Sequence, residues 1–184
     1  LPLKLKNYAL DAEKGLLQLF YEAPSWIYRE EIRFGQADNS KQMTRTAFLL
    51  NTGAEAQKIK RFQINYPLPL EGEYLYPGTF FYDNTHAFGD FSDVSYPATQ
   101  RAGKNSDLPL KGYWKSAPHS SILLTRCGDA PAQIIFPVKF YEGVDLWQRR
   151  TEDMAISEIR FGVEGYFDPG IEQEIGKLVI QAAS

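Results

Sequence analysis

The segment "WIYREEIRF" (26–34) decides the fold class, because its apolar and polar side chains alternate. Successive side chains of an extended chain point to opposite faces, so this alternation is typical of a half-buried strand. One face carries Trp26, Tyr28, Ile32 and Phe34, and the other carries Ile27, Arg29, Glu31 and Arg33. Only Glu30 and Ile27 depart from the pattern. We therefore predict a β-strand over 26–34.

Similar short patterns recur along the chain, separated by turn residues roughly every 8–12 positions, which is typical of β-sandwiches. Further strands are expected at 8–10, 16–21, 44–50, 57–64, 120–127, 132–141 and 155–167. The turn "DAEKG" (11–15) joins the first two, and "NTGAEA" (51–56) is expected to make a hairpin of 44–50 and 57–64. The sequence predicts an all-β fold, an antiparallel β-sandwich with long aromatic-rich loops and at most one or two short helices, in a single domain over 1–184.

Two segments leave room for a helix. "VDLWQRRTEDMA" (144–155) places Val144, Trp147 and Met154 roughly on one helical face, and it is expected to hold the only sizeable helix. "DPGIEQEIGKL" (168–178) suits either a helix that starts at its Asp-Pro or a turn into a last strand ending in "KLVIQ". The strand is slightly favoured.

The pentapeptide "EIRFG" occurs twice, at 31–35 and at 158–162. The flanking residues differ, which argues against an internal duplication. If the copies paired antiparallel with Ile32 opposite Ile159, each copy's glutamate would face the other copy's arginine. We therefore predict that these early and late strands are neighbours in one sheet. Copies in different sheets would refute this prediction.

Composition and charge limit the classes of partner. The chain has 184 residues, 43% of them hydrophobic, which is enough to bury a core without a disulfide or metal. A net charge of −3 and scattered basic residues argue against a nucleic-acid surface, and no apolar stretch approaches the length of a membrane span. The chain begins Leu-Pro-Leu without a targeting signal, so we expect a mature protein or an excised domain. Its single cysteine suits a cytoplasmic protein and equally a secreted bacterial one, and we predict a secreted or periplasmic location. The sequence leaves the oligomeric state open.

No motif in the sequence identifies a catalytic reaction. The two histidines are His86 and His119. His119 stands beside Ser120 and Ser121, but neighbours in a strand point to opposite faces, so their adjacency does not indicate a triad. Cys127, the only cysteine, is expected to be an inert thiol. Nucleophile-elbow and glycine-rich phosphate motifs are absent, so no cofactor is expected.

The densest group of oxygen donors is "YDNTHAFGDFSD" (82–93), which contains Asp83, Asn84, Asp90 and Asp93. Hard oxygen ligands at this density suit Ca²⁺, although their spacing does not match an EF-hand loop. Asp and Asn side chains that bond their own backbone explain the same cluster. The second interpretation is favoured, so we predict no metal site.

Aromatic residues cluster in Gly- and Pro-rich segments between 74 and 91, and Trp114 follows. An exposed ring offers a flat apolar surface to a sugar, while neighbouring Asp, Asn and His can bond its hydroxyls. Most of these rings are expected to be core or loop anchors. Tyr82 and Trp114 are flanked by polar residues, so for these two a sugar-binding role and a structural role are more evenly balanced. We predict a carbohydrate-binding site made by Tyr82, Asp83, His86 and Trp114.

Two segments together resemble the galactose-mutarotase-like supersandwich domains. "LKNYALDAEKGLLQLFYE" (5–22) resembles the first hairpin of those domains, and "RTAFLLNTGAEAQKIKRFQINYPLPL" (45–70) resembles a later strand that ends at an Asn-Thr-Gly turn. The likeness covers under a third of the chain, and no catalytic residue is carried over. Such domains often stand at the N-terminus of glycoside hydrolases and polysaccharide lyases. The resemblance implies a carbohydrate-related role.

These observations predict a non-catalytic β-sandwich module that binds carbohydrate or supports a carbohydrate-active enzyme, with a sugar or a neighbouring catalytic domain as its partner. A free-standing sugar-processing enzyme that uses the acids of 83–93 with His86 is the first alternative. An assembly subunit that meets protein partners through its Tyr and Phe surface is the second.

Overall fold

The computed structural model describes residues 3–35, 41–76, 101–104, 106, 114–115, 123–139 and 144–182. These residues contain no α-helix, and the all-β prediction is confirmed. The strands are β1 (Lys4–Asp11), β2 (Leu16–Ala23), β3 (Trp26–Phe34), β4 (Gln42–Asn51), β5 (Gln57–Leu68), β6 (Glu73–Tyr76), β7 (Arg101–Lys104), β8 (Trp114–Lys115), β9 (Leu123–Arg126), β10 (Gln133–Lys139), β11 (Val144–Arg150), β12 (Ala155–Phe167) and β13 (Glu172–Ala182).

The described residues fall into two compact units. The first unit lies within Leu1–Phe62, Ile134–Gly143 and Phe161–Ser184, and the second lies within Gln63–Gln133 and Val144–Arg160. The single domain over 1–184 stays a prediction.

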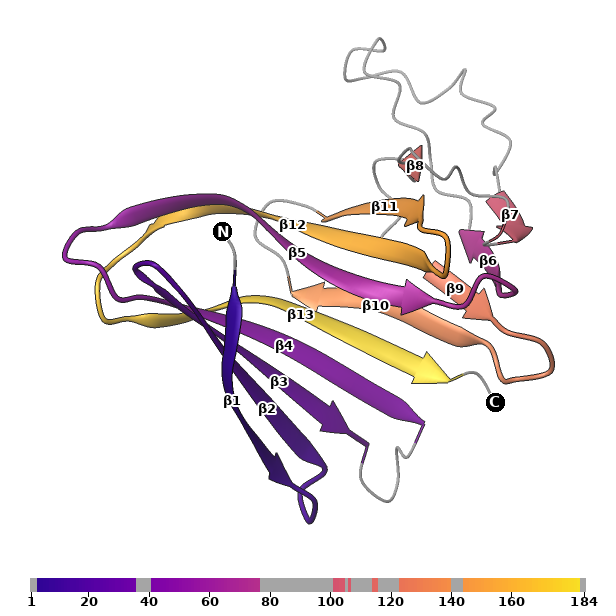
Figure 1. Cartoon of the computed structure of the whole chain (residues 1–184), viewed down its shortest axis with the longest axis horizontal. Coiled ribbons are helices and arrows are strands. Elements are labelled where there is room, and N and C mark those ends of the chain that lie inside the picture. Colours follow the sequence, from indigo (N-terminus) through magenta and orange to yellow (C-terminus); the bar gives the residue numbers. More distant parts are fainter. Residues whose placement is uncertain are drawn as a thin grey trace, which may run out of the picture. The chain divides into compact units, whose positions relative to one another are not determined.

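The first unit contains an antiparallel sheet in the order β1-β2-β3-β4-β13-β10. Figure 1 shows β1 to β4 running side by side as a meander. The predicted hairpin around "DAEKG" is confirmed, since β1 pairs antiparallel with β2. Gly15 closes its turn with a positive φ of 57°, a conformation that glycine adopts at little cost. A short turn at Pro24 and Ser25 then leads from β2 into β3.

A second layer, made by residues 57–62 of β5 and 161–167 of β12, covers part of this sheet. Trp26 packs edge-on against Phe167 with ring centroids 5.7 Å apart, and Tyr28 lies 5.5 Å from Phe62. Phe161 stacks on Phe62 and lies close to Gly176 of β13, where a side chain would meet its ring. The β-sandwich prediction is confirmed, and these aromatic rings form part of its core in this unit.

The second unit contains β9-β6-β7 as one antiparallel group, together with residues of β5-β12-β11-β8. Its buried apolar side chains include Ile64, Leu68, Leu123 and Ile159. Glu158 is 2% exposed, and its charge is paired with Arg160 at 2.6 Å.

Two sequence predictions were wrong. Strands β4 and β5 do not form a hairpin, since β4 pairs with β3 and β13 whereas β5 belongs to the other sheet. The expected helix at 144–155 is instead β11 followed by a tight turn, where the Thr151 amide donates to the Met154 carbonyl at 2.8 Å. The favoured strand at the end of the chain is confirmed as β13.

The predicted pairing of the two "EIRFG" copies is also wrong, because β3 and β12 lie in different sheets. Each copy instead forms an ion pair within its own strand, Arg33 with Glu31 at 3.0 Å and Arg160 with Glu158 at 2.6 Å. Side chains two apart share a face of a strand, so the repeated letters repeat a local contact.

The step from one sheet to the other in the first unit is fixed by Asn51, which is fully buried. Its side-chain amide donates to the carbonyls of Glu55 and Phe167, both at 2.7 Å, and its oxygen accepts the Gly53 amide at 2.8 Å. Its own carbonyl accepts the Gly170 amide at 2.9 Å. The Asn51 side chain thus joins the end of β4 to the end of β12, and its backbone joins the same point to the turn that precedes β13.

Replacing Asn51 by Ala should lower the free energy of unfolding by about 3 kcal/mol, because buried backbone groups lose their partners at a cost of about 1–3 kcal/mol each. The exposed Asn7, which bonds its neighbour's amide in β1, provides the control. Asn7→Ala should cost less than about 0.5 kcal/mol. Chemical denaturation measures both, and equal losses for the two variants would contradict the role given to Asn51.

Candidate functional site

The inner side of the first unit's sheet is only partly covered. Cross-strand register places the side chains of neighbouring strands on the same side as Trp26 and Tyr28, which the second layer buries. Ala47 and Leu49 of β4 are buried on this side as well, and towards β1 the same side becomes accessible. We call this part the open face, together with the buried Glu30 at its boundary; its residues are Leu5, Tyr8 and Leu10 of β1, Leu17, Leu19 and Tyr21 of β2, Glu30, Ile32 and Phe34 of β3, and Arg45 of β4.

The open face is apolar and aromatic where it is most accessible. Tyr8 and Leu10 are each 65% exposed, Leu5 is 54% exposed and Phe34 is 49% exposed. Tyr21 is half-buried and packs its ring 5.5 Å from that of Tyr28. Exposed apolar side chains gathered on one surface mark sites of contact with ligands or partners.

A buried ion pair adds polarity to the open face. Glu30 is 4% exposed, and the Nε of Arg45 donates to its carboxylate at 2.5 Å. The Tyr28 hydroxyl also hydrogen-bonds to Glu30, and burial together with this carboxylate raises the pKa of Tyr28 far above its usual value. Burial and the charge of Glu30 likewise raise the pKa of Tyr21. Both tyrosines therefore stay protonated hydrogen-bond donors at physiological pH.

These features combine into a surface that can bind a small polar ligand. The rings of Tyr8 and Tyr21 supply a flat apolar wall, while Arg45 and the Tyr21 hydroxyl supply polar groups, with Arg45 held by the buried Glu30. Ligand sites generally join an apolar lining to a few placed polar groups. The carboxylate of Glu30 is held in place by Arg45 and by the Tyr28 hydroxyl, so this polar group has a fixed orientation.

The opposite side of the same strands carries a network of charges. Glu31 accepts hydrogen bonds from Gln18 at 3.0 Å, Arg29 at 2.5 Å and Arg33 at 3.0 Å. Arg29 also pairs with Glu172 at 2.6 Å and lies 3.9 Å from the centroid of the Phe48 ring. Burial opposes ionisation of Glu31, but the three hydrogen bonds together outweigh it and lower its pKa.

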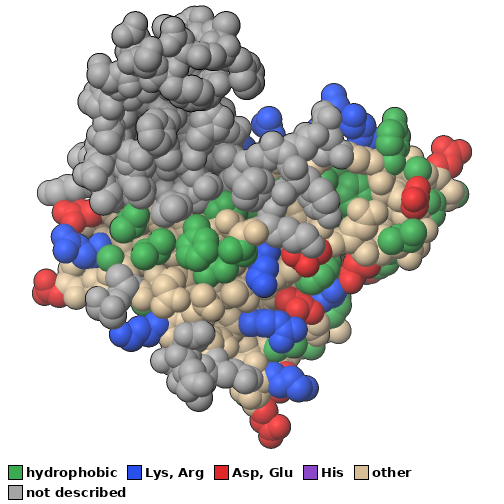
Figure 2. Space-filling model, turned by 180° about the vertical axis from the view of Figure 1, so that it is seen from behind, with side chains coloured by type: hydrophobic (Ala, Val, Ile, Leu, Met, Phe, Trp, Pro, Cys, Tyr) green, Lys and Arg blue, Asp and Glu red, His purple; other side chains and the backbone are tan. Residues whose placement is uncertain are grey.

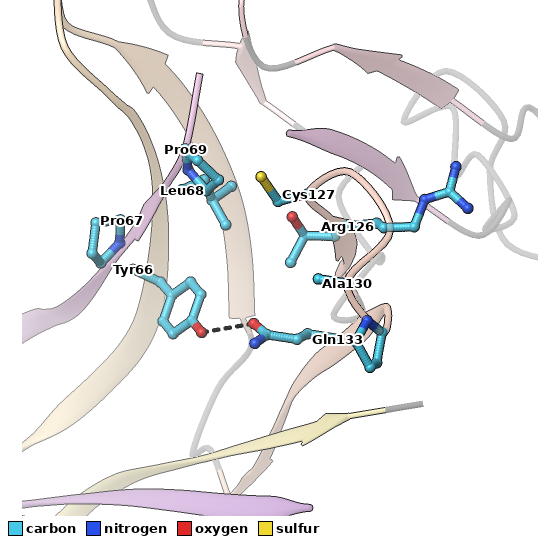
Figure 3. Close-up of a pocket in the computed structure, with 10 residues that line it drawn as sticks. Tyr66, Pro67, Leu68, Pro69, Arg126, Cys127, Ala130 and Gln133 are labelled. Carbon is cyan, nitrogen blue, oxygen red and sulfur yellow. Dashed lines mark hydrogen bonds between the residues drawn. The ribbon is translucent and has the colours of Figure 1, made fainter. Parts of the chain in front are cut away.

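The second unit has a cavity of about 270 Å³ between the end of β5 and the β9–β10 turn. Figure 3 shows Leu68 and Pro69 on one side and Cys127 on the other. The polar groups at its rim are already paired, since the Tyr66 hydroxyl donates to Gln133 at 2.9 Å. Arg126, which also lines it, is paired with Glu73. The open face is the stronger candidate, because these polar side chains of the cavity already have hydrogen-bond or ion-pair partners within the protein.

The predicted site residues stay largely untested. Tyr82, Asp83 and His86 lie outside the described residues, as do the remaining acids of 83–93 and His119. Trp114 lies in β8 opposite Gln148 of β11, and its side chain is not described. The secreted or periplasmic location stays a prediction.

Other features of the described residues carry less information about function. Figure 2 shows acidic and basic side chains interleaved on the face in view. No His, Cys, Asp and Glu side chains group in a way that could hold a metal ion within the described ranges. In the same ranges, no helix is long and apolar enough to cross a membrane.

Sequence reasoning missed the open face. Its polar pair did leave a signal, because Glu30 interrupts the apolar face of "WIYREEIRF". A charged residue at a core position needs a partner, and Arg45 lies near the start of the next strand, β4, on the same face.

No protein-family model matches the sequence, and no curated protein matches it. The structure is similar to a candidate aldose 1-epimerase from Escherichia coli K12, with a TM-score of 0.60, 12% identity and coverage of 98% of this chain and 68% of that one. It is also similar to a galactose mutarotase related enzyme from Lactobacillus acidophilus, with a TM-score of 0.51, 9% identity and coverage of 99% and 71%. A protein from Synechocystis sp. PCC 6803 matches with a TM-score of 0.50, 10% identity and coverage of 100% and 66%.

These comparisons show the fold. The chain has the galactose-mutarotase-like fold, and the likeness extends over nearly all of it rather than under a third. The chain spans about two thirds of the length of the structures that it matches.

Replacing Arg45 by Ala should cost about 3 kcal/mol or more, because it leaves the Glu30 carboxylate buried without its charge partner. Arg33 is the matched control, since its side chain is 52% exposed and also pairs with a glutamate. Arg33→Ala should cost less than about 1 kcal/mol. Thermal and chemical denaturation compare the two, and similar losses would contradict the burial of the Glu30–Arg45 pair.

The lowered pKa of Glu31 predicts a pH dependence of stability. Its ionised form is favoured in the folded state, so its contribution is present above the unfolded value of 4.5 and is lost as pH falls through the lower folded pKa. The stability difference between the wild type and Glu31→Gln should be constant near neutral pH and shrink below that value. A difference that stays constant down to the acid transition would contradict the prediction.

Proposed function

We propose that this chain is a non-catalytic β-sandwich module that binds carbohydrate or supports a carbohydrate-active enzyme. The observation that carries the proposal is the galactose-mutarotase-like fold over nearly the whole chain. Two of the similar structures are named for activities on sugars, an aldose 1-epimerase and a galactose mutarotase related enzyme. The proposal transfers the class of ligand, and not the reaction.

The open face supports contact with a sugar. A pyranose ring has one apolar C–H face, which suits the exposed ring of Tyr8 and the side chain of Leu10 beside it. Its hydroxyls need donors and acceptors, and the Tyr21 hydroxyl and the Glu30–Arg45 pair stand on the same side of the sheet. The predicted loop residues Tyr82, Asp83, His86 and Trp114 are proposed as further contacts.

The state of the described carboxylates favours binding over catalysis. A general acid or base must exchange its proton near the working pH. Glu30, Glu31 and Glu158 are buried or half-buried, and each is held in place by an ion pair with an arginine. Groups held in this way orient a ligand's hydroxyls more readily than they transfer protons.

Affinity electrophoresis through gels that contain neutral polysaccharides, followed by calorimetry with the best-retained sugar, tests the proposal. Tyr8→Ala should weaken binding by roughly tenfold, the equivalent of about 1.4 kcal/mol, because it removes a ring that stacks on the sugar. Tyr166→Ala is the matched control, since Tyr166 of β12 is 69% exposed and is not part of the open face. It should leave binding unchanged.

Each outcome is informative. Loss of binding with Tyr82→Ala or Trp114→Ala alone would keep the carbohydrate ligand but move its site to the predicted loop residues. Retention by no polysaccharide and no sugar would overturn the proposed function. Turnover of a sugar substrate that Asp83→Asn abolishes would favour the enzyme instead.

A further inference from the structure

Strand β1 forms one edge of the first unit's sheet and pairs, within the described residues, with β2. Residues 4–10 of this strand are all exposed. The Tyr8 amide donates to the side chain of its own neighbour Asn7 at 2.8 Å, so it is turned to the open edge rather than to β2. An exposed edge of this kind is a template for pairing with another strand.

Two copies of β1 that run antiparallel to each other can place complementary side chains opposite one another. Its register with β2 places Leu5, Tyr8 and Leu10 on one side, and Lys4, Asn7, Ala9 and Asp11 on the other, with an irregularity at Lys6. In an antiparallel pair of two β1 strands centred on Tyr8, the irregularity aligns Leu5 with Leu10 of the second copy and Lys4 with Asp11. Lys4 would then stand opposite Asp11 twice, beside the Lys14 that already pairs with Asp11 at 2.6 Å, and apolar side chains would meet on the open-face side.

We propose that two copies of this chain associate through antiparallel pairing of their β1 strands, with Tyr8 on the two-fold axis. A two-fold axis requires that each contact occurs twice, and the charge pattern of β1 satisfies this condition at a single register. Since the Tyr8 amide and carbonyl point to the edge, the two Tyr8 residues exchange both of their backbone hydrogen bonds once each amide releases the Asn7 side chain. The open faces of the two copies then continue into one another across the axis.

The association gives the exposed apolar side chains of β1 a partner of the same chemistry. Leu5 and Leu10 are 54% and 65% exposed in one copy, and each would cover the other across the axis. On the opposite side, the pairing of Lys4 with Asp11 favours this register over registers in which like charges would face each other. This proposal does not depend on the proposed carbohydrate binding, because it concerns the edge of the sheet.

Cysteine crosslinking tests the register directly, in a Cys127→Ser background that removes the native thiol. Residues opposite one another in an antiparallel pair have Cβ atoms about 4.5–5.5 Å apart, which is close to disulfide geometry. Tyr8→Cys should therefore form a disulfide-linked dimer under mild oxidation. Leu10→Cys is the matched control, since it has the same 65% exposure but lies well away from its own copy across the axis.

The expected result is at least tenfold faster crosslinking of Tyr8→Cys than of Leu10→Cys. A mixture of Leu5→Cys with Leu10→Cys should crosslink as well as Tyr8→Cys does. Circular dichroism checks that each variant is folded.

Sedimentation equilibrium of the wild type without any sugar should show a monomer–dimer equilibrium. Equal rates for Tyr8→Cys and Leu10→Cys, or a wild type that stays monomeric at high concentration, would overturn the proposal. A different partner for β1, such as a further segment of a longer chain, would give that second outcome.

Discussion

The first unit depends on the hydrogen bonds of one buried side chain, that of Asn51. The chain must leave β4 in one sheet and enter β5 in the other, and the backbone groups of this crossing need hydrogen-bond partners outside the strand ladders. Asn51 supplies those partners at Glu55, Gly53 and Phe167. Because Phe167 ends β12, the same side chain also fixes where the second layer stops.

The position of that second layer determines which part of the sheet is accessible to the proposed ligand. Phe62 and Phe167 cover Tyr28 and Trp26, but the layer does not extend over β1 or over the far end of β3, where Phe34 is 49% exposed. A sheet that is wider than its cover leaves an apolar surface accessible. Glu30 and Arg45 lie at the boundary, where the cover is sufficient to bury their ion pair.

Local sequence patterns predicted the elements that depend on local physics. Alternation identified β3, and Gly15 identified the first hairpin, because a strand's faces and a positive φ are properties of a few neighbouring residues. The choice of partner strand could not be predicted in the same way. The "NTG" turn suits a hairpin as well as a crossing between sheets, and the difference lies in a hydrogen bond from Asn51 to Phe167, far along the chain. The open face was missed for a related reason: whether Tyr8 is covered depends on where the second layer ends, which no residue near Tyr8 encodes.

The central claim is that recognition takes place on the open face. The most direct test is an NMR titration of methyl- and tyrosine-labelled protein with the sugar that it retains best. The account predicts shift changes concentrated on Leu10, Leu17 and Tyr21, with the buried Leu123 of the second unit unaffected. Shift changes confined to Leu68 and its cavity in the second unit, with the resonances of β1 and β2 unmoved, would contradict it.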